Sequence, residues 1–202
     1  MLITGIVKGK GNKYRVYGDE EYLFSLYGKE LKRYHIAEQE NVEAELITVI
    51  LNEVIYKRAR ERALFLLESR PMTVKMVRDK LKQNEYPDEI ISRVVEFLLK
   101  YHYLDDMNYI DLYMQTYSLK KSKKQIMLEL GKKGVSKELI DGYLETHAFS
   151  DEQGFKVQFE KYTRDKDLSD YKIRQKVFRY FYGKGYGSSV IEGEIRHKIE
   201  SV

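Results

Sequence analysis

Apolar and polar residues alternate in short runs through the first 27 positions, and from there to the C-terminus they recur with helical spacing. Residues 2–27 contain two turns, Lys8–Lys13 and Gly18–Glu20, between β-prone runs, which is typical of a β-meander. Residues 29–36 and 42–70 have helical patterns, the second with room for one interruption. Because the strands are followed only by helices, the pattern argues against a parallel α/β sheet.

One template of five apolar positions occurs three times between residues 77 and 191. The first copy is Val77, Leu81, Tyr86, Ile90 and Ile91, the second is Ile126, Leu130, Val135, Leu139 and Ile140, and the third is Val177, Phe181, Tyr186, Val190 and Ile191. Every position is offset by 49 residues from the first copy to the second, and by 51 from the second to the third. Such self-similarity indicates a repeat architecture, in which each small unit buries its apolar face against a neighbour.

Each copy of the template predicts two helices joined by a turn. Its first two positions lie four residues apart, on one helix face. The turn contains Gly134 in the second copy and Gly185 in the third, where a left-handed residue commonly ends a helix. The first copy has Glu85 at this place, and Pro87 follows at a helix start.

A further helix precedes each pair, so that each repeat has three helices. These leading helices are expected over residues 55–69, 107–119 and 152–164. Capping-box spacing marks two helix starts, at Ser122 with Gln125 and at Ser150 with Gln153. We predict a mainly α protein with three tandem three-helix repeats in an elongated curved array, preceded by a small N-terminal β-meander or hairpin and a helical linker. The predicted boundaries are 1–53 for the N-terminal segment with its linker helices, 54–104 for repeat 1, 105–149 for repeat 2 and 150–202 for repeat 3.

Composition narrows the class of protein. Hydrophobic residues make up 43% of the chain, which is enough for a core, and two prolines in 202 residues leave room for long helices. The absence of cysteine excludes a disulfide framework and a thiolate metal site. No stretch approaches 18 consecutive apolar residues, and the first ten residues lack a secretory apolar core. We therefore expect a cytoplasmic protein that does not associate with membranes.

The net charge of +4 is unevenly distributed. The N-terminal 50 residues carry seven basic and eight acidic groups, whereas residues 51–104 carry eleven and eight, residues 105–149 seven and seven, and residues 150–202 eleven and nine. This balance is too mild for a protein whose affinity comes mainly from neutralising phosphates. We expect any contact with nucleic acid to be partial, or shared with a protein partner.

Three predicted helices concentrate the basic residues, over residues 74–82, 122–133 and 171–184. Successive basic helices can form a stripe that faces phosphates or an acidic protein surface. The alternative is a set of ordinary solvated faces, which imperfect register favours: Lys75 and Lys124 correspond, but the third copy has Gln175. The candidate contact residues are Lys75, Arg78, Lys82, Lys123, Lys124, Lys132, Lys133, Lys172, Arg174, Arg179 and Lys184.

The second helix pair also has the outline of a helix-turn-helix. Its recognition helix, over residues 137–147, would present Glu138, Asp141 and Glu145 to DNA phosphates. This charge is wrong for docking in the major groove, so a plain turn between two helices is favoured.

Tyrosine is abundant, with 18 residues, and offers a second kind of contact. Tyr109, Tyr113 and Tyr117 recur every four residues and could stack single-stranded bases, but such spacing favours packing between units. Tyr180 and Tyr182 lie on different helix faces, so at least one is expected near the surface, as a better contact candidate.

Evidence for an enzyme or a metal site is poor. The four histidines, His35, His102, His147 and His197, have no metal-ligand spacing. Asp105 and Asp106 fit a helix start, and the aspartates at 165, 167 and 170 lack the glycine and distal glutamate of a calcium loop. We expect a non-enzymatic binding protein without catalytic residues, cofactor or metal.

Three short motifs, in order along the chain, resemble those of the RecX regulatory proteins. They are Tyr103-Leu104-Asp105-Asp106, then Ile126, Leu130 and Lys133-Gly134-Val135, then Arg179-Tyr180 and Gly183-Lys184-Gly185-Tyr186. With its β-rich start and helical linker, the chain is similar to the longer, Gram-positive type over essentially its whole length. It departs from the family pattern at His102, where glycine is usual, and at Ser122, where a Lys-Gly pair is common.

The resemblance implies a modulator of the RecA recombinase. Such proteins lie in the helical groove of the RecA filament on DNA, suppress its ATPase and strand exchange, and promote loss of protomers or block filament growth. The implied partners are the RecA filament and single- or double-stranded DNA, contacted weakly or through the filament, by a monomer. Two alternatives stay open, a helix-turn-helix-like transcriptional regulator and a helical adaptor for another protein.

Overall fold

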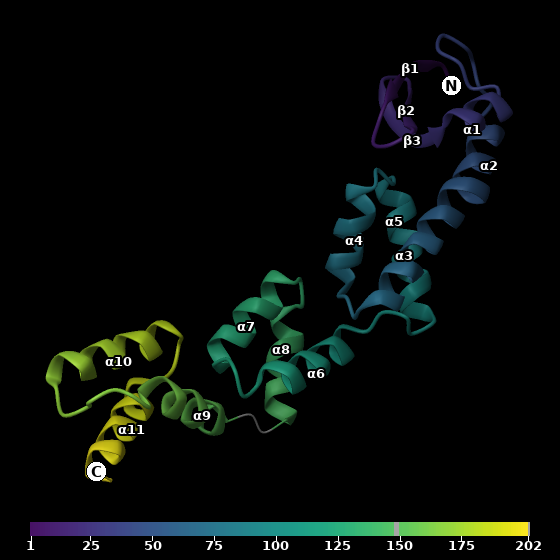
Figure 1. Cartoon of the computed structure of the whole chain (residues 1–202). Helices are drawn as coiled ribbons and strands as arrows, with labels where there is room; N and C mark the ends of the chain where they lie inside the picture. Colours follow the sequence, from purple (N-terminus) through teal and green to yellow (C-terminus); the bar gives the residue numbers. More distant parts are fainter. Residues whose placement is uncertain (148–149, 202) are drawn as a thin grey trace. The chain divides into compact units, whose positions relative to one another are not determined.

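The structure, a computed structural model, describes residues 1–147 and 150–201 (Figure 1). The chain divides into two units, Met1–Asp105 and Asp106–Val202. The first contains a small sheet and the helices of repeat 1, and the second contains the helices of repeats 2 and 3. The prediction of a mainly α protein with an N-terminal β segment is confirmed, while the elongated curved array stays a prediction.

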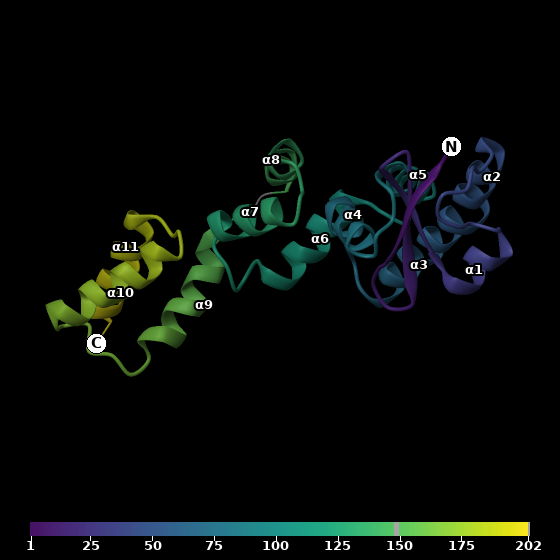
Figure 2. The same ribbon diagram turned by 90° about the horizontal axis from the view of Figure 1, so that it is seen from above.

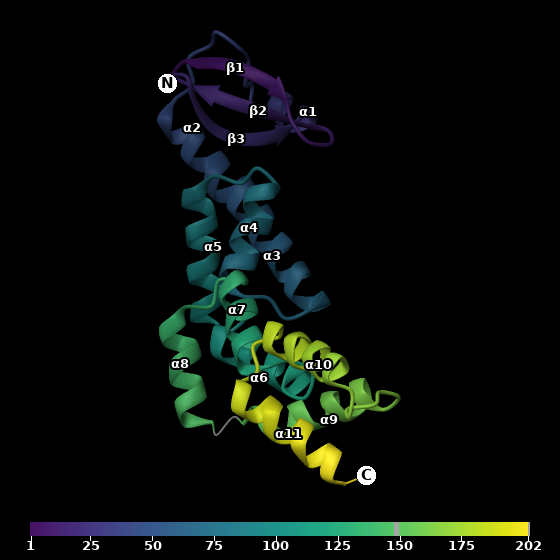
Figure 3. The same cartoon turned by 90° about the vertical axis from the view of Figure 1, so that its left-hand side faces the viewer.

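The N-terminal sheet is an antiparallel meander of three strands, β1 (Ile3–Lys8), β2 (Lys13–Gly18) and β3 (Glu21–Tyr27), in that order (Figure 3). Asp19 and Glu20 join β2 to β3 with φ values of 49° and 70°. Two consecutive positive φ values are what a tight hairpin turn requires, because its twist then matches that of the strands. The predicted β-meander is therefore confirmed.

One long helical segment connects the sheet to repeat 1. After α1 (Gly28–Arg33), the chain runs without a break through α2 (Ala44–Val49), a π-helical stretch η1 (Ile50–Tyr56) and α3 (Lys57–Ser69). The interruption allowed by the sequence pattern is thus a local change of hydrogen bonding rather than a turn. It keeps Ile50 and Ile55 both buried, five positions apart.

The sheet and repeat 1 share one hydrophobic core. Ile3, Val16, Phe24 and Leu26 of the sheet are buried in the same cluster as α4 (Val74–Gln83) and α5 (Asp88–Lys100). The views of this unit agree that the sheet lies at one end of α4 and α5 (Figures 1 and 3). The boundary predicted at residues 53 and 54 therefore falls inside one continuous core, in η1, and as a domain boundary it stays a prediction.

The second unit contains two sets of three helices (Figure 2). Repeat 2 comprises α6 (Asp106–Tyr117), α7 (Lys123–Lys132) and α8 (Lys137–Thr146). Repeat 3 comprises α9 (Asp151–Thr163), α10 (Tyr171–Gly183) and α11 (Ser188–Glu200). Their buried residues form two separate clusters, so the expected stacking of apolar faces is not what joins these repeats. The boundary predicted between them falls at residue 149, outside the described residues.

The apolar template matches the burial closely. Thirteen of its fifteen positions are buried, and the other two, Leu139 and Val190, are half-buried against their clusters. The turns also agree, since Gly134 and Gly185 both have a φ of 90° and Glu85, in the first copy, has a φ of 62°. His102 is left-handed as well, with a φ of 56°, at the position where the resembled family usually has glycine.

The two predicted capping boxes have different outcomes. Ser122 forms the box with Gln125 at the start of α7, as predicted. Ser150 is the N-cap of α9, but its hydroxyl accepts from the backbone N–H of Glu152 at 3.2 Å. The predicted box with Gln153 is therefore wrong, because the serine bonds one residue earlier than that motif requires.

Candidate functional site

Two of the four basic residues of α4 are paired with neighbouring acids. Lys75 Nζ lies 2.6 Å from a carboxylate oxygen of Asp79, and Lys82 Nζ lies 3.1 Å from Asp88. Arg78 donates to the hydroxyl of Ser92 at 3.3 Å. The side chains of both ion pairs are exposed, so these pairs contribute little to stability and their lysines can bind another anion instead.

The basic residues of α7 border an apolar groove of about 580 Å³. Lys123 and Lys124 lie at its rim, and Met127 and Leu128 are in its wall. Lys132 is exposed, and the ammonium of Lys133 lies 5.9 Å from the ring centroid of Tyr113.

The basic residues of α10 have diverse surroundings. Arg174 donates to the carbonyl oxygens of Leu168 and Ser169, at 2.9 and 2.7 Å, and so holds the turn before the helix. Arg179 donates to the carbonyl of Gln175, one turn earlier in its own helix, and Lys172 is exposed. The contact roles proposed for α4, α7 and α10 stay predictions, and the structure gathers only some of these side chains at common sites.

Repeats 2 and 3 meet through polar and backbone contacts. The hydroxyl of Ser122 donates to the carbonyl of Lys184 at 2.6 Å, and the backbone N–H of Lys123 donates to Asp151 at 2.6 Å. Burial raises the pKa of Asp151 above its usual range, although the Lys123 N–H opposes this shift. A Cβ built on Gly154 would lie 2.7 Å from the carbonyl oxygen of Ser118, so only glycine allows α9 to approach this closely.

A pocket of about 550 Å³ opens beside this junction. It is formed by the segment after α6, by one face of α9 with the turn that follows, and by the end of α10. We call it the lysine–tyrosine pocket, and its lining residues are Leu119, Lys120, Val157, Gln158, Lys161, Tyr162, Lys166, Tyr180, Phe181 and Lys184. Four of these are lysines and none is acidic.

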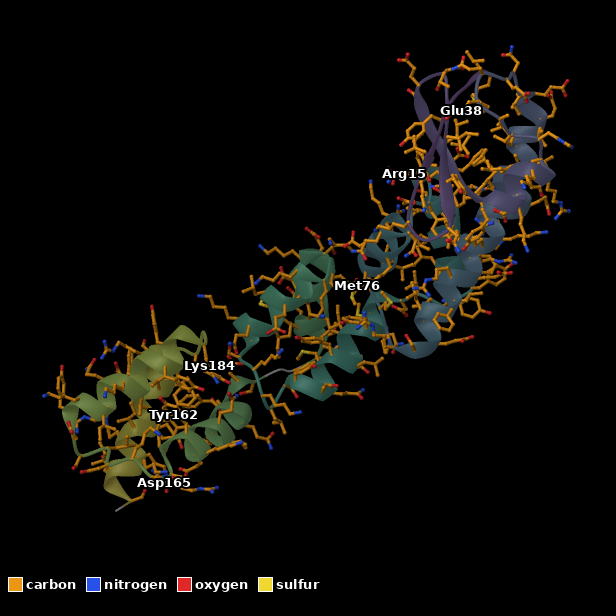
Figure 4. All side chains as sticks on the ribbon, turned by 45° about the horizontal axis from the view of Figure 1, so that its top comes forward. Arg15, Glu38, Met76, Tyr162, Asp165 and Lys184 are labelled. Atoms are coloured by element: carbon orange, nitrogen blue, oxygen red, sulfur yellow. The ribbon has the colours of Figure 1, made fainter. Side chains whose placement is uncertain are left out.

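Two tyrosine rings form one wall of the pocket. Tyr162 of α9 and Tyr180 of α10 stack with centroids 4.0 Å apart and an interplanar angle of 1°. The Lys166 ammonium lies 4.2 Å from the Tyr162 centroid, and that of Lys184 lies 4.5 Å from the Tyr180 centroid. Figure 4 marks Tyr162 and Lys184, with Asp165 in the turn after α9. Cation–π contacts of this kind hold the two ammonium groups in place while leaving their charge unpaired.

A hydrogen-bonded chain supports the pocket from behind. Gln158 donates to the hydroxyl of Tyr186 at 2.6 Å, and Lys184 Nζ lies 3.5 Å from the side-chain oxygen of Gln158. Burial raises the pKa of Tyr186 to about 12, so its hydroxyl keeps its proton at neutral pH. Phe181 is fully buried behind this wall and packs against Tyr186 with ring centroids 5.9 Å apart.

The sequence selected one lysine of this pocket, Lys184, and missed Lys120, Lys161 and Lys166. The missed residues lie outside the basic helices, in the connection after α6, near the end of α9 and in the turn that follows. Tyr180 was selected and is 39% exposed, while Tyr182 is 61% exposed. The signals that pointed here were the basic helix over residues 171–184 and the pairing of Tyr180 with the Gly183–Tyr186 motif.

Other predicted contacts are structural. Tyr109, Tyr113 and Tyr117 stack in series, with centroids 6.2 and 4.5 Å apart, and pack on the core of repeat 2. The packing interpretation holds, but within one repeat rather than between units. Asp170 caps α10 by accepting from the Lys172 N–H at 2.7 Å, which agrees with a linker rather than a calcium loop.

Residues 1–147 and 150–201 contain neither a cluster of metal ligands nor a membrane-spanning helix. These residues contain no group of three or more histidine, aspartate or glutamate side chains placed to hold a metal ion. No helix among them is both long and apolar enough to cross a membrane.

The sequence is similar to proteins of one known family. Residues 59–98 match the family described as RecX, first three-helix domain, and residues 155–193 match RecX, third three-helix domain. The regulatory protein RecX of Clostridium acetobutylicum is 32% identical over 96% of this chain and 93% of its own length. That of Caldanaerobacter subterraneus subsp. tengcongensis is 31% identical over 95% and 97%.

Two solved structures share the fold. A crystal structure of regulatory protein RecX has a TM-score of 0.61 and 24% identity, and the match covers 95% of this chain and 97% of that one. The structure of RecX from Lactobacillus salivarius has a TM-score of 0.62 and 23% identity, with coverage of 73% and 97%.

Proposed function

Because the chain belongs to the RecX family of regulatory proteins, we propose that it is a negative regulator of the RecA recombinase. It binds along the groove of the RecA filament on DNA and lowers the rates of ATP hydrolysis and strand exchange. The observation that carries this proposal is the family match over nearly the whole chain.

The surface chemistry is compatible with a filament as partner. Exposed lysines and arginines occur on α4, α7 and α10, one helix in each repeat, so successive repeats can each contact a phosphate or an acidic protein surface. By contrast α8 carries Glu138, Asp141 and Glu145, which weighs against its use as a DNA recognition helix. A regulator that touches DNA within a protein–DNA complex fits the modest net charge better than an independent DNA-binding protein does.

The proposal is tested by adding the protein, below stoichiometry, to RecA assembled on single-stranded DNA and following ATP hydrolysis. We expect hydrolysis to fall with increasing protein, because each bound regulator affects several protomers. A variant with reversed charge at Lys123, Lys124, Lys132 and Lys133 should inhibit less, and the wild type is its control. Unchanged hydrolysis over a wide titration of the wild type would contradict the proposal. Specific retention of duplex DNA with a defined half-site spacing would favour a transcriptional regulator instead.

A further inference from the structure

The lysine–tyrosine pocket has a charge that nothing within it balances. It contains four lysines, and its lining has no carboxylate. The neighbouring Glu160 is paired with Lys198, at 2.7 Å. Lys120 and Lys161 are exposed, and neither takes part in an ion pair among the described residues. Gathering four like charges around one pocket is unfavourable unless an anion occupies it, so the arrangement indicates an anionic ligand.

The walls of the pocket narrow the choice of anion. Leu119 is 47% exposed and Val157 is 56% exposed, so apolar surface lies directly beside the cations. A ligand that fits must therefore carry negative charge and an apolar or aromatic group close together. A single nucleic acid strand presents this combination, because its phosphates alternate with unpaired bases that stack on apolar and aromatic side chains. Duplex DNA keeps the faces of its bases stacked inside the helix.

We infer that the lysine–tyrosine pocket binds the backbone of single-stranded nucleic acid, with its lysines on the phosphates and its exposed apolar residues, Leu119 and Val157, beside a base. This inference deepens the proposed function by assigning the surface with which the regulator contacts DNA. It also accounts for the way the pocket is built. Lys166 and Lys184 are held against tyrosine rings, whereas Lys120 and Lys161 are free to follow the ligand.

The test compares two double variants that remove the same charge. Lys120→Gln with Lys161→Gln removes the two free lysines of the pocket. The control, Lys137→Gln with Lys156→Gln, removes two exposed lysines of the same unit that lie outside the pocket and outside the candidate contact residues. Binding to a fluorescein-labelled thymidine oligonucleotide of about 20 nucleotides, a length chosen to span more than one site, is followed by fluorescence anisotropy without RecA. Far-UV circular dichroism checks that each variant is folded.

Salt dependence gives the expected size of the effect. Each phosphate contact on a single strand contributes about 0.7 to the slope of log affinity against log salt concentration, so two lost contacts lower the slope by about 1.4. When the salt concentration rises from about 50 to 200 mM, both proteins lose affinity. The fold-loss should be about seven times smaller for the pocket variant than for the wild type. The control should keep the wild-type slope. Leu119→Ala, at an exposed apolar position of the pocket, should weaken binding at every salt concentration and leave the slope unchanged, because an apolar contact with a base releases no counterions.

Several outcomes would overturn the inference. These are absence of oligonucleotide binding by the wild type, an unchanged slope in the pocket variant, and an equal loss of slope in the control. Polyglutamate that competes as well as the oligonucleotide would instead assign the pocket to an acidic protein segment. Because RecA is absent from this assay, its result is independent of the ATPase test of the proposed function.

Discussion

Glu85 is the clearest case in which one residue serves two opposing demands. It ends α4 in the left-handed conformation, with a φ of 62°, where repeats 2 and 3 have glycine. Its carboxylate also lies 3.1 Å from Arg15 Nε and accepts from the backbone N–H of Lys10 at 3.3 Å. Figure 4 marks Arg15 on the sheet. The contacts that the carboxylate makes oppose the conformational cost of keeping a side chain at this position.

The two contributions can be separated with Glu85→Ala and Glu85→Gly. Both variants lose the carboxylate, whose ion pair with Arg15 and hydrogen bond from the Lys10 N–H are together worth about 2 kcal/mol at this partly exposed site. Glycine also removes the cost, about 1.5 kcal/mol, of holding a residue with a Cβ in the left-handed conformation. It destabilises the protein by about 0.7 kcal/mol in turn, because the unfolded chain has more freedom at a glycine. We expect the free energy of unfolding to fall by about 2 kcal/mol in the alanine variant and by about 1 kcal/mol in the glycine variant.

Hydrogen exchange with mass spectrometry is the appropriate assay, because the two units need not unfold together. Peptides from β2 and β3 should exchange faster in both variants, and faster with alanine than with glycine. Peptides from α9 and α10 serve as the internal reference and should not change. Glu85→Gln, which keeps an acceptor but not the charge, should fall between the wild type and alanine. If the glycine variant were as protected from exchange as the wild type, the carboxylate would not outweigh the strain. If the alanine and glycine variants were equally protected, the left-handed backbone at this position would carry no measurable strain.

Three further predictions concern the second unit. Ser122→Ala should destabilise it by about 2 kcal/mol in urea unfolding followed by circular dichroism, because the hydroxyl both caps α7 and donates to repeat 3. The Lys121 ammonium lies 2.5 Å from the Glu129 carboxylate and lowers the pKa of that group. The ion pair therefore stabilises the folded protein fully at pH values above the usual carboxyl range, and this stabilisation is lost as the pH falls through the lowered pKa. Melting temperatures between about pH 7 and 3 should therefore fall less steeply in Glu129→Gln, and parallel curves would contradict this. Gly154→Ala should destabilise this unit by about 1–3 kcal/mol, because the added Cβ meets the backbone of Ser118. Gly193→Ala adds a Cβ in open space on a helix and should stabilise the unit by up to about 1 kcal/mol. Equal effects of the two substitutions would show that the close contact at Gly154 is unimportant.

The repeat cores could be predicted from sequence because burial follows apolar spacing directly. Val77 and Leu81 lie four apart on one face of α4, and both are fully buried, as are their equivalents in α10. The ends of these helices could be predicted for a similar reason, since Gly134 and Gly185 report a backbone conformation that other residues adopt at a cost.

The remaining features depend on contacts between distant segments, for which a single sequence has no local signal. The lysine–tyrosine pocket combines Lys120 with Lys161 and Lys184 from three different segments, so no spacing rule selects them together. The sheet docks on the α4–α5 turn through residues 15 and 85, far apart in sequence. The π-helical turns of η1 change the hydrogen bonding of a segment whose composition is ordinary for a helix.

These observations give the turn between the second and third helix of a repeat a common role. In repeat 1 the neighbour at this turn is the sheet, which offers Arg15 and a backbone N–H, and a carboxylate at Glu85 can bind both. In repeat 3 the neighbour is the start of α7, and a Cβ on Gly185 would lie 3.0 Å from that of Lys124, in a backbone with a φ of 90°. The turn is therefore where each of these repeats meets what precedes it, and the size of the gap decides between the two residues. Glutamate fits where the neighbour leaves room for a side chain and supplies donors, whereas glycine is required where the neighbour packs directly on the turn.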